Sequence, residues 1–187
     1  MPRVASTTRQ PYSPLAVESS AVPLVRSVLE GDVDAVHEIL MSPHVIAGSM
    51  RVPFSGIHVT RDRLAPRPGV HQVVAEIEGD VVGFAELLTE PDEPRQRHVG
   101  DLNMVATHAD WLGRGVGRAL TEAIVDLGFN WLNLTRIGLI VFTDNAVAIK
   151  LYESLGFNLE GTMPKLGYGS GAWMDAHMMG LIREPSS

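Results

Sequence analysis

Hydrophobic and polar residues follow two periods along this chain, and together they predict a mixed α/β fold. Apolar or alternating runs predict strands at residues 24–29, 70–77, 81–88, 98–107, 137–142 and 173–182, with a further extended run before a Gly-rich hairpin at 167–171. Apolar residues at helical spacing predict helices at 33–40, 114–132 and 145–155, and a helical turn at 60–64. The order strand, one or two helices, three strands, helix, strand, helix, two strands predicts a mixed sheet with helices on both faces.

Turn residues divide these elements. Glu78-Gly79-Asp80 predicts a tight hairpin, and residues 44–58 are expected to be irregular after Ser42 and Pro43 end the first helix. Trp131 is expected on the apolar face of the helix at 114–132. Residues 1–22, rich in Pro, Ser and Thr, are interpreted as a mobile arm or as an arm that docks on a partner subunit, and 23–187 as a single domain.

Composition narrows the classes of function. Of 187 residues, 45% are hydrophobic and 20% charged, as in an ordinary soluble domain, and the net charge of −7 without a basic cluster argues against a nucleic-acid partner. The chain has no cysteine, which excludes disulfides and thiolate nucleophiles, and its seven histidines show no metal-binding spacing. No apolar run approaches the ~20 residues of a membrane span. We therefore expect a cytoplasmic protein, a homodimer, with no metal, membrane or nucleic acid.

The junction between a strand and a helix at residues 101–120 carries the strongest chemical signal. The strand ends near Thr107, glycines follow at 113, 115 and 117, and the helix begins at once. Such a junction presents unpaired backbone N–H groups at a positive helix end, which suits phosphate oxygens. The spacing departs from the dinucleotide motif, and Arg118 stands where a phosphate-binding P-loop needs lysine. The alternative is a helix that merely starts with a flexible turn.

A second signal lies on the helix at 145–155. Asn145 and Tyr152 are seven residues apart, almost two helical turns, so both side chains face the same way. Asn145 also opens the helix, where its side chain can cap the backbone or reach a ligand. The alternative is a capping asparagine and a core tyrosine.

Together these features resemble the GNAT superfamily of acetyl-CoA-dependent N-acetyltransferases. The resemblance covers residues 23–183 and is strongest over 101–162, where the motif Q/R-x-x-G-x-G/A falls on Leu112 to Gly117, with leucine at its first position. The segments 136–145, 148–150 and 160–162 are similar to a bacterial branch assigned to free L-amino acid N-acetylation. The resemblance implies a mostly antiparallel, twisted sheet of six or seven strands, splayed between the fourth and fifth.

The resemblance also implies roles for individual residues. Acetyl-CoA would be the co-substrate, with its pyrophosphate on the backbone amides of Gly113, Arg114, Gly115, Val116, Gly117 and Arg118. Its pantetheine arm would pair with Val105, Ala106 and Thr107 and contact Asn145, and a backbone amide there would stabilise the oxyanion. Tyr152 would protonate the departing thiolate.

The general base and the acceptor site stay more open. Ile140 stands where many members place a glutamate, whereas Asp101 matches the position of a carboxylate in other members; Glu86 and His98 are alternatives. Acceptor binding is expected from residues 48–63, with Phe54 as an apolar wall, and from Glu86. Three arginines could pair with a carboxylate or be merely exposed: Arg51, Arg61 and Arg63.

The sequence therefore predicts acetyl transfer to a primary amine, the α-amino group of a free L-amino acid, by direct attack in a ternary complex. An alternative enzyme acetylates a protein N-terminus or a lysine. A non-catalytic acetyl-CoA-binding module and a nucleotide-dependent oxidoreductase are further alternatives.

Overall fold

The structure, a computed structural model, describes residues 22–183, so the predicted arm at 1–22 lies outside the described residues except for Val22. The strands are β1 (Leu24–Ser27), β2 (Val70–Ile77), β3 (Asp80–Thr89), β4 (Val99–Thr107), β5 (Arg136–Phe142), β6 (Asn158–Gly169) and β7 (Ala172–Ile182). The α-helices are α1 (Val33–Met41), α2 (Pro43–Ala47), α3 (Ile57–Leu64), α4 (Val116–Asp126) and α5 (Ala146–Ser154). Three short turns complete them: η1 (Glu30–Asp32), η2 (Ala109–Trp111) and η3 (Leu127–Trp131).

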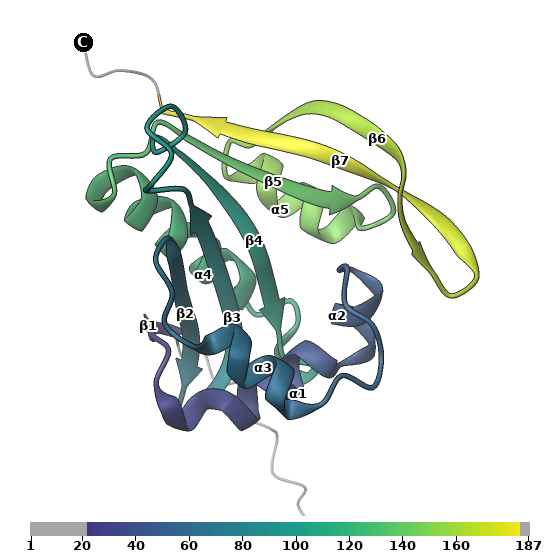
Figure 1. The fold of residues 1–187 in the computed structure, drawn as a ribbon. Coiled ribbons are helices and arrows are strands. Elements are labelled where there is room, and N and C mark those ends of the chain that lie inside the picture. The colour runs from purple at the N-terminus through teal and green to yellow at the C-terminus, as the bar shows by residue number, and fades with distance from the viewer. Residues whose placement is uncertain (1–21, 184–187) are drawn as a thin grey trace, which may run out of the picture.

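The strands form one twisted sheet of seven strands in the order β1-β2-β3-β4-β5-β7-β6 (Figure 1). All neighbours are antiparallel except β4 and β5, which confirms the mostly antiparallel sheet predicted from the sequence. The β2–β3 hairpin turns at Glu78 and Gly79, whose φ angles of 54° and 94° fit the tight turn expected there.

The sheet opens between its fourth and fifth strands. β4 pairs with β5 only over Val99–Asp101 and Arg136–Gly138. Beyond these three pairs the two strands diverge (Figure 1), so one edge of β4 from Leu102 to Thr107 has no neighbouring strand. This divergence is the predicted splay.

Helices cover both faces, as predicted. On one face α4, η3 and α5 pack against a cluster that includes Leu102, Leu120 and Leu139. On the other face α1 and α2 pack against a smaller cluster around Phe84 and Met104, with Leu64 of α3 at its margin. Figure 1 shows α4 behind the sheet and α1 and α3 in front of it.

Two local predictions were wrong. Residues 43–47 form helix α2 rather than an irregular segment, because Pro43 occupies the first helical position, where its missing N–H costs nothing. The predicted helix at 114–132 ends at Asp126 and continues as a π-helical turn, closed by the Leu132 N–H donating to the Leu127 carbonyl at 3.0 Å. The wider turn rotates Trp131 off the apolar face, and it is 77% exposed.

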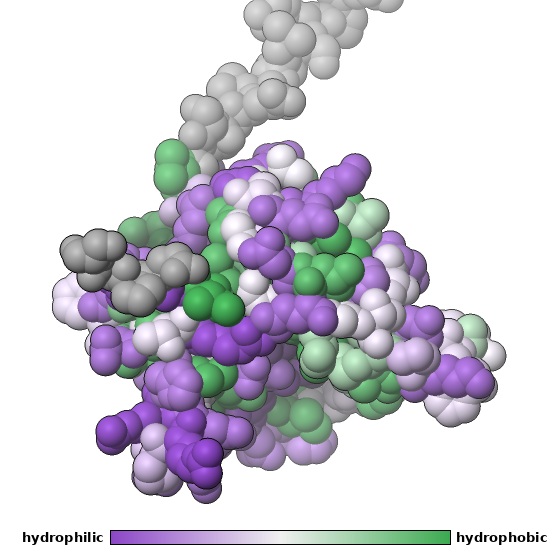
Figure 2. All heavy atoms as spheres, turned by 90° about the horizontal axis from the view of Figure 1, so that it is seen from above, coloured by the Kyte–Doolittle hydropathy of each residue, from purple (hydrophilic) through white to green (hydrophobic). Residues whose placement is uncertain are grey.

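The face seen from above in Figure 2 carries hydrophilic side chains interspersed with small hydrophobic groups. Among the described residues, no helix is both long and apolar enough to cross a membrane.

Candidate functional site

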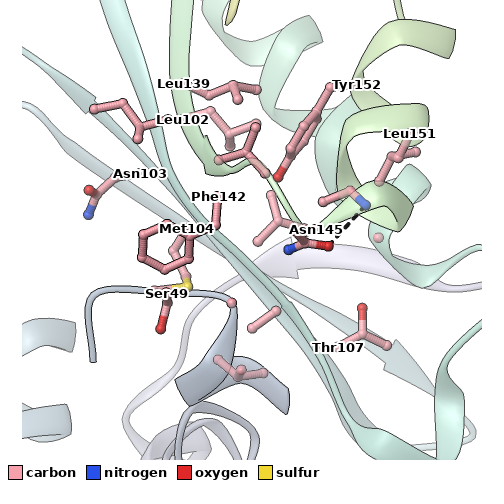
Figure 3. Close-up of a pocket in the computed structure, with 18 of the residues that line it drawn as sticks. Ser49, Leu102, Asn103, Met104, Thr107, Leu139, Phe142, Asn145, Leu151 and Tyr152 are labelled. Carbon is pink, nitrogen blue, oxygen red and sulfur yellow. Dashed lines mark hydrogen bonds between the residues drawn. The ribbon is translucent and has the colours of Figure 1, made fainter. Parts of the chain in front are cut away.

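A cleft of about 1050 Å³ occupies the opening between β4 and β5. Its lining comes from the diverging strands, α2 and the loop after it, the glycine loop before α4, α5, and the β6–β7 hairpin (Figure 3). Segments far apart in the sequence thus meet at the one place where the sheet is not closed.

The glycine loop forms one end of this cleft. Gly113 and Gly115 have φ angles of 73° and 82°, a left-handed conformation that disfavours other residues, and α4 begins directly after Gly115. The first bond to the Gly115 carbonyl comes from the Ala119 N–H at 3.0 Å, so the amides of residues 116–118 have no acceptor within the helix.

Most residues around this loop line the cleft, but not all. Gly113, Gly115, Val116, Gly117 and Arg118 line the cleft. Arg114 does not line the cleft, and its guanidinium lies 4.9 Å from the centre of the Trp111 ring. Arg118 donates to the Ser154 hydroxyl at 2.7 Å and so ties α4 to α5.

The free edge of β4 lines the cleft between this loop and the point where the strands meet. Val105, Ala106 and Thr107, the expected pantetheine partners, all lie there. His44 of α2 lies with its Nε2 atom 3.0 Å from the Thr107 carbonyl, which fixes α2 against the end of β4. The edge therefore offers backbone groups to an extended ligand.

Asn145 caps α5 at the cleft wall, as its position in the sequence predicted. Its Oδ1 accepts a hydrogen bond from the Ala148 N–H at 3.2 Å (Figure 3). Its Nδ2 lies close to Gly48 at the end of α2. A β-carbon added at Gly48 would lie 3.2 Å from that nitrogen. The amide group thus serves both the helix and the cleft.

Tyr152 is 8% exposed and packs against Phe157 with the two rings tilted by 60° and 5.7 Å between their centres. Figure 3 shows its hydroxyl end directed into the cleft, toward Asn145. No hydrogen bond joins this hydroxyl to another residue within 22–183, and burial raises the pKa of Tyr152 to about 12. At neutral pH it is a protonated hydroxyl available as a donor.

Asp101 lies where the two strands separate, paired with Gly138. Leu102 packs in the same cluster as Tyr152, and successive side chains of a strand alternate in direction. The Asp101 carboxylate is therefore on the opposite face of the sheet from Tyr152, in agreement with its Oδ1 lying 3.1 Å from a β-carbon added at Gly138.

A second carboxylate, that of Glu160 on β6, also lines the cleft. Arg136 binds it through both guanidinium nitrogens, with Nη1 at 2.6 Å from Oε1. This pairing lowers the pKa of Glu160, which makes it a weaker proton acceptor. Asp101 accepts no hydrogen bond from a described residue and interacts with Arg136 only through charge. His98, the alternative base, does not line the cleft.

Glu86, predicted to contact the acceptor, lies behind the wall of the cleft. It is 1% exposed and does not line the cleft. Its carboxylate accepts hydrogen bonds from Arg63 Nη2 and Asn103 Nδ2 at 2.6 Å and from Gln72 Nε2 at 2.7 Å. These bonds occupy the buried carboxylate, and through them Glu86 holds Arg63 and Asn103 at the wall.

The segment at 48–63 lines the cleft through some of the side chains expected there and not through others. Phe54, which has a φ of 65°, is 97% exposed and does not line the cleft. Arg51 and Arg63 line the cleft, whereas Arg61 is exposed elsewhere on α3.

Sequence reasoning missed several polar residues of the wall. These residues are on strands, where a polar residue normally indicates a position that faces solvent: Arg136, Glu160 and Asn103. Asn103 lies where the register between β3 and β4 shifts, and it has no partner on β3. Only its polar character within a predicted strand could have marked it as a residue of the cleft. Within residues 22–183, no three His, Asp or Glu side chains gather as metal ligands would.

Comparisons with known proteins agree with this architecture. The family model described as "Acetyltransferase (GNAT) family" matches residues 33–157. The L-amino acid N-acetyltransferase AaaT of Escherichia coli K12 is 38% identical over 160 residues, which cover 86% of this chain and 98% of that protein.

Solved structures of the same fold add ligands to the comparison. The putative acetyltransferase yncA from Salmonella typhimurium was solved with its cofactor acetyl-CoA. It matches with a TM-score of 0.77 and 23% identity, and the match covers 89% of this chain and 97% of the yncA chain. A phosphinothricin acetyltransferase from Sinorhizobium meliloti in complex with AcCoA has a TM-score of 0.75 and 21% identity, with coverages of 86% and 88%. At these identities the likeness shows the fold.

Proposed function

The chain belongs to the GNAT acetyltransferase family, and from this premise we propose that it transfers acetyl from acetyl-CoA to the α-amino group of a free L-amino acid. Acetyl transfer by an enzyme of this family follows from membership. The amino acid as acceptor is supported by the 38% identity to AaaT over almost its whole length. We assign the activity to one domain, residues 23–187, and the proposal includes a cytoplasmic homodimer.

One observation carries the proposal: an unpaired strand edge leads to an unpaired helix N-terminus along a single cleft. The amides of residues 116–118 and the turn at Gly113 and Gly115 suit a pyrophosphate. The edge of β4 at 105–107 suits the amide groups of a pantetheine arm, which would lie beside it as an added strand. These residues therefore fit acetyl-CoA.

The proposed proton acceptor for the amine and the proposed hydrogen-bond donor to the departing sulfur lie on opposite faces of the sheet. Bound acetyl-CoA supplies an activated thioester at the opening between the strands. Asp101, on the α3 face, would accept a proton from the attacking amine, which must be neutral to react and has a pKa above neutrality. A backbone amide on the free edge of β4 would stabilise charge on the thioester oxygen.

Tyr152 acts from the other face, where the thiol leaves. Its pKa of about 12 keeps the hydroxyl protonated across the physiological range. Because a thiol has a pKa near ~8.5, the hydroxyl first donates a hydrogen bond to the departing sulfur, and that bond strengthens as negative charge develops there. No nucleophilic side chain is needed for this direct transfer.

A thiol-release assay tests the proposal. The purified protein is mixed with acetyl-CoA and each of the twenty L-amino acids, with polyamines, and with short peptides that carry a free N-terminus or lysine. We expect CoA release with one or more free amino acids and none with the other amines. Release only with peptides would establish the protein acetyltransferase, and tight acetyl-CoA binding without release would establish a binding module.

A further inference from the structure

Two arginines in the cleft wall have buried nitrogens without partners. Arg51 lies in the loop after α2, and Arg63 lies in the last turn of α3. The Nε atom of each is buried and makes no hydrogen bond to any of the residues 22–183. Arg63 donates through Nη2 to Glu86, whereas the Arg51 guanidinium makes no hydrogen bond or ion pair with any of the described residues. Folded proteins rarely leave buried donors unsatisfied, so these two nitrogens indicate that a ligand supplies the acceptor.

The charges of this site do not balance. Arg51 and Arg63 bring two positive charges, and the Glu86 carboxylate brings one negative charge, which leaves one positive charge in this group of three side chains. Loss of solvent and then the neighbouring Arg63 lower the pKa of Arg51, while Glu86 opposes this. A monoanion in the cleft would neutralise the excess and accept from both planar guanidinium groups, which match a carboxylate.

This pair of arginines lies on the acceptor side of the sheet. Leu88 of β3 pairs with Asp101, and Glu86 pairs with Met104, so all these side chains project from the face that α3 covers. Glu86 and Leu88 are two residues apart, about 7 Å along the strand. An amine near Asp101 and a carboxylate at the arginines can therefore belong to one small molecule.

We propose that Arg51 and Arg63 form the subsite for the carboxylate of the acceptor, with Glu86 as the group that positions Arg63. The identification of the anion as an amino acid's own carboxylate rests on the proposed function. The subsite selects amines that carry a neighbouring carboxylate. It disfavours polyamines, which add positive charge beside the arginines, and carboxamides, whose neutral amide group does not balance the arginine charge.

Arg51 gives the clean variant, since no other side chain depends on it. With saturating acetyl-CoA, kcat/KM is measured for L-alanine, L-leucine and L-phenylalanine and for their carboxamides. Loss of a charged hydrogen-bond pair predicts a fall of about 10- to 100-fold for the acids in Arg51→Met, with the carboxamides unchanged. The control Arg61→Met, on the same helix as Arg63 but outside the cleft, should match wild type.

Two further readouts separate this inference from the proposed function. Arg51→Met should melt at the same temperature as wild type or higher, because it removes a poorly balanced charge; a lower melting temperature would make Arg51 structural and overturn the inference. The amine-free acid 4-methylpentanoate should raise the melting temperature of wild type and not of Arg51→Met. Equal shifts in both proteins, or none in wild type, would overturn the subsite even if amino acids are acetylated. A selective shift without any acetylation would keep the subsite and reject the proposed function.

Discussion

Tyr152 and Asp101 lie on opposite faces of the sheet, and the proposed mechanism gives them different tasks. The buried Tyr152 hydroxyl, with a pKa of about 12, is the proposed donor to the leaving group. The Asp101 carboxylate, which has no hydrogen-bond partner in 22–183, is the proposed acceptor of the proton from the amine. The two groups are therefore tested by different measurements: kcat together with acetyl-CoA affinity for Tyr152, and the pH–rate profile for Asp101.

Tyr152→Phe removes the hydroxyl and keeps the ring that packs on Phe157. Because one donor to a developing negative charge is worth about 3 kcal/mol, kcat should fall roughly 100-fold. The affinity for acetyl-CoA, measured by calorimetry, should stay near that of wild type. A turnover number within twofold of wild type would reject the hydroxyl as the donor to sulfur.

Asp101→Asn keeps the shape of the side chain and removes its basicity. We expect kcat to fall at neutral pH and to recover partly at higher pH, where more of the amine is already neutral. The pH–rate profile measures this directly. A profile that superimposes on that of wild type would eliminate Asp101 as the base and leave deprotonation to water.

At the scale of elements, the cleft lies where β4 and β5 part after three residue pairs. These two strands are parallel and so need a crossover, here α4 with its π-helical turn. The start of α4 is thereby placed at the far end of the free edge of β4. Strand edge and helix terminus are consecutive in sequence and contiguous in space.

The glycine turn before α4 should matter through its conformation. Gly115 has a φ of 82°, and a β-carbon there would meet no atom within 4 Å, so Gly115→Ala strains only the backbone. We expect the KM for acetyl-CoA to rise about tenfold as the turn moves. Gly79→Ala is the matched control, with a φ of 94° and equally open space in the β2–β3 hairpin. Equal effects of the two variants on KM would contradict a role of the turn in binding.

The start of α1 depends on an ion pair far from the cleft. Arg26 of β1 donates to both carboxylate oxygens of Asp32, at 2.7 and 3.0 Å, and this pairing lowers the pKa of Asp32 from its ordinary value. A carboxylate whose pKa is lower in the folded state stabilises the fold at pH values above its pKa in the unfolded chain. This stabilisation is lost as the pH falls through its pKa in the folded state. Asp32→Asn should therefore lower the free energy of unfolding by about 2 kcal/mol at pH 7 and by less at pH 3.

Urea denaturation at the two pH values measures this difference. Asp34→Asn, an exposed carboxylate in the first turn of the same helix, is the control and should change stability little at either pH. A deficit of Asp32→Asn that is the same at pH 3 as at pH 7 would contradict the assigned ion pair.

At the scale of the whole molecule, periodicity predicted most of the architecture but not the chemistry of the wall. The meander, the hairpin at Glu78–Gly79 and the helix at Asn145 follow from local residues, so the sequence located them. The places of Glu86, Phe54 and Arg51 depend on how α3 and its loop dock on the sheet, which no local pattern encodes. The same docking brings Arg63 from a surface-like helix against a buried carboxylate on β3.

The crystal structure of the protein with coenzyme A tests the central claim most directly. We predict the diphosphate on the amides of residues 116–118, the pantetheine along β4 at 105–107, and the sulfur within hydrogen-bonding reach of the Tyr152 hydroxyl. Coenzyme A bound at another surface, or with its sulfur directed away from Tyr152, would contradict the account.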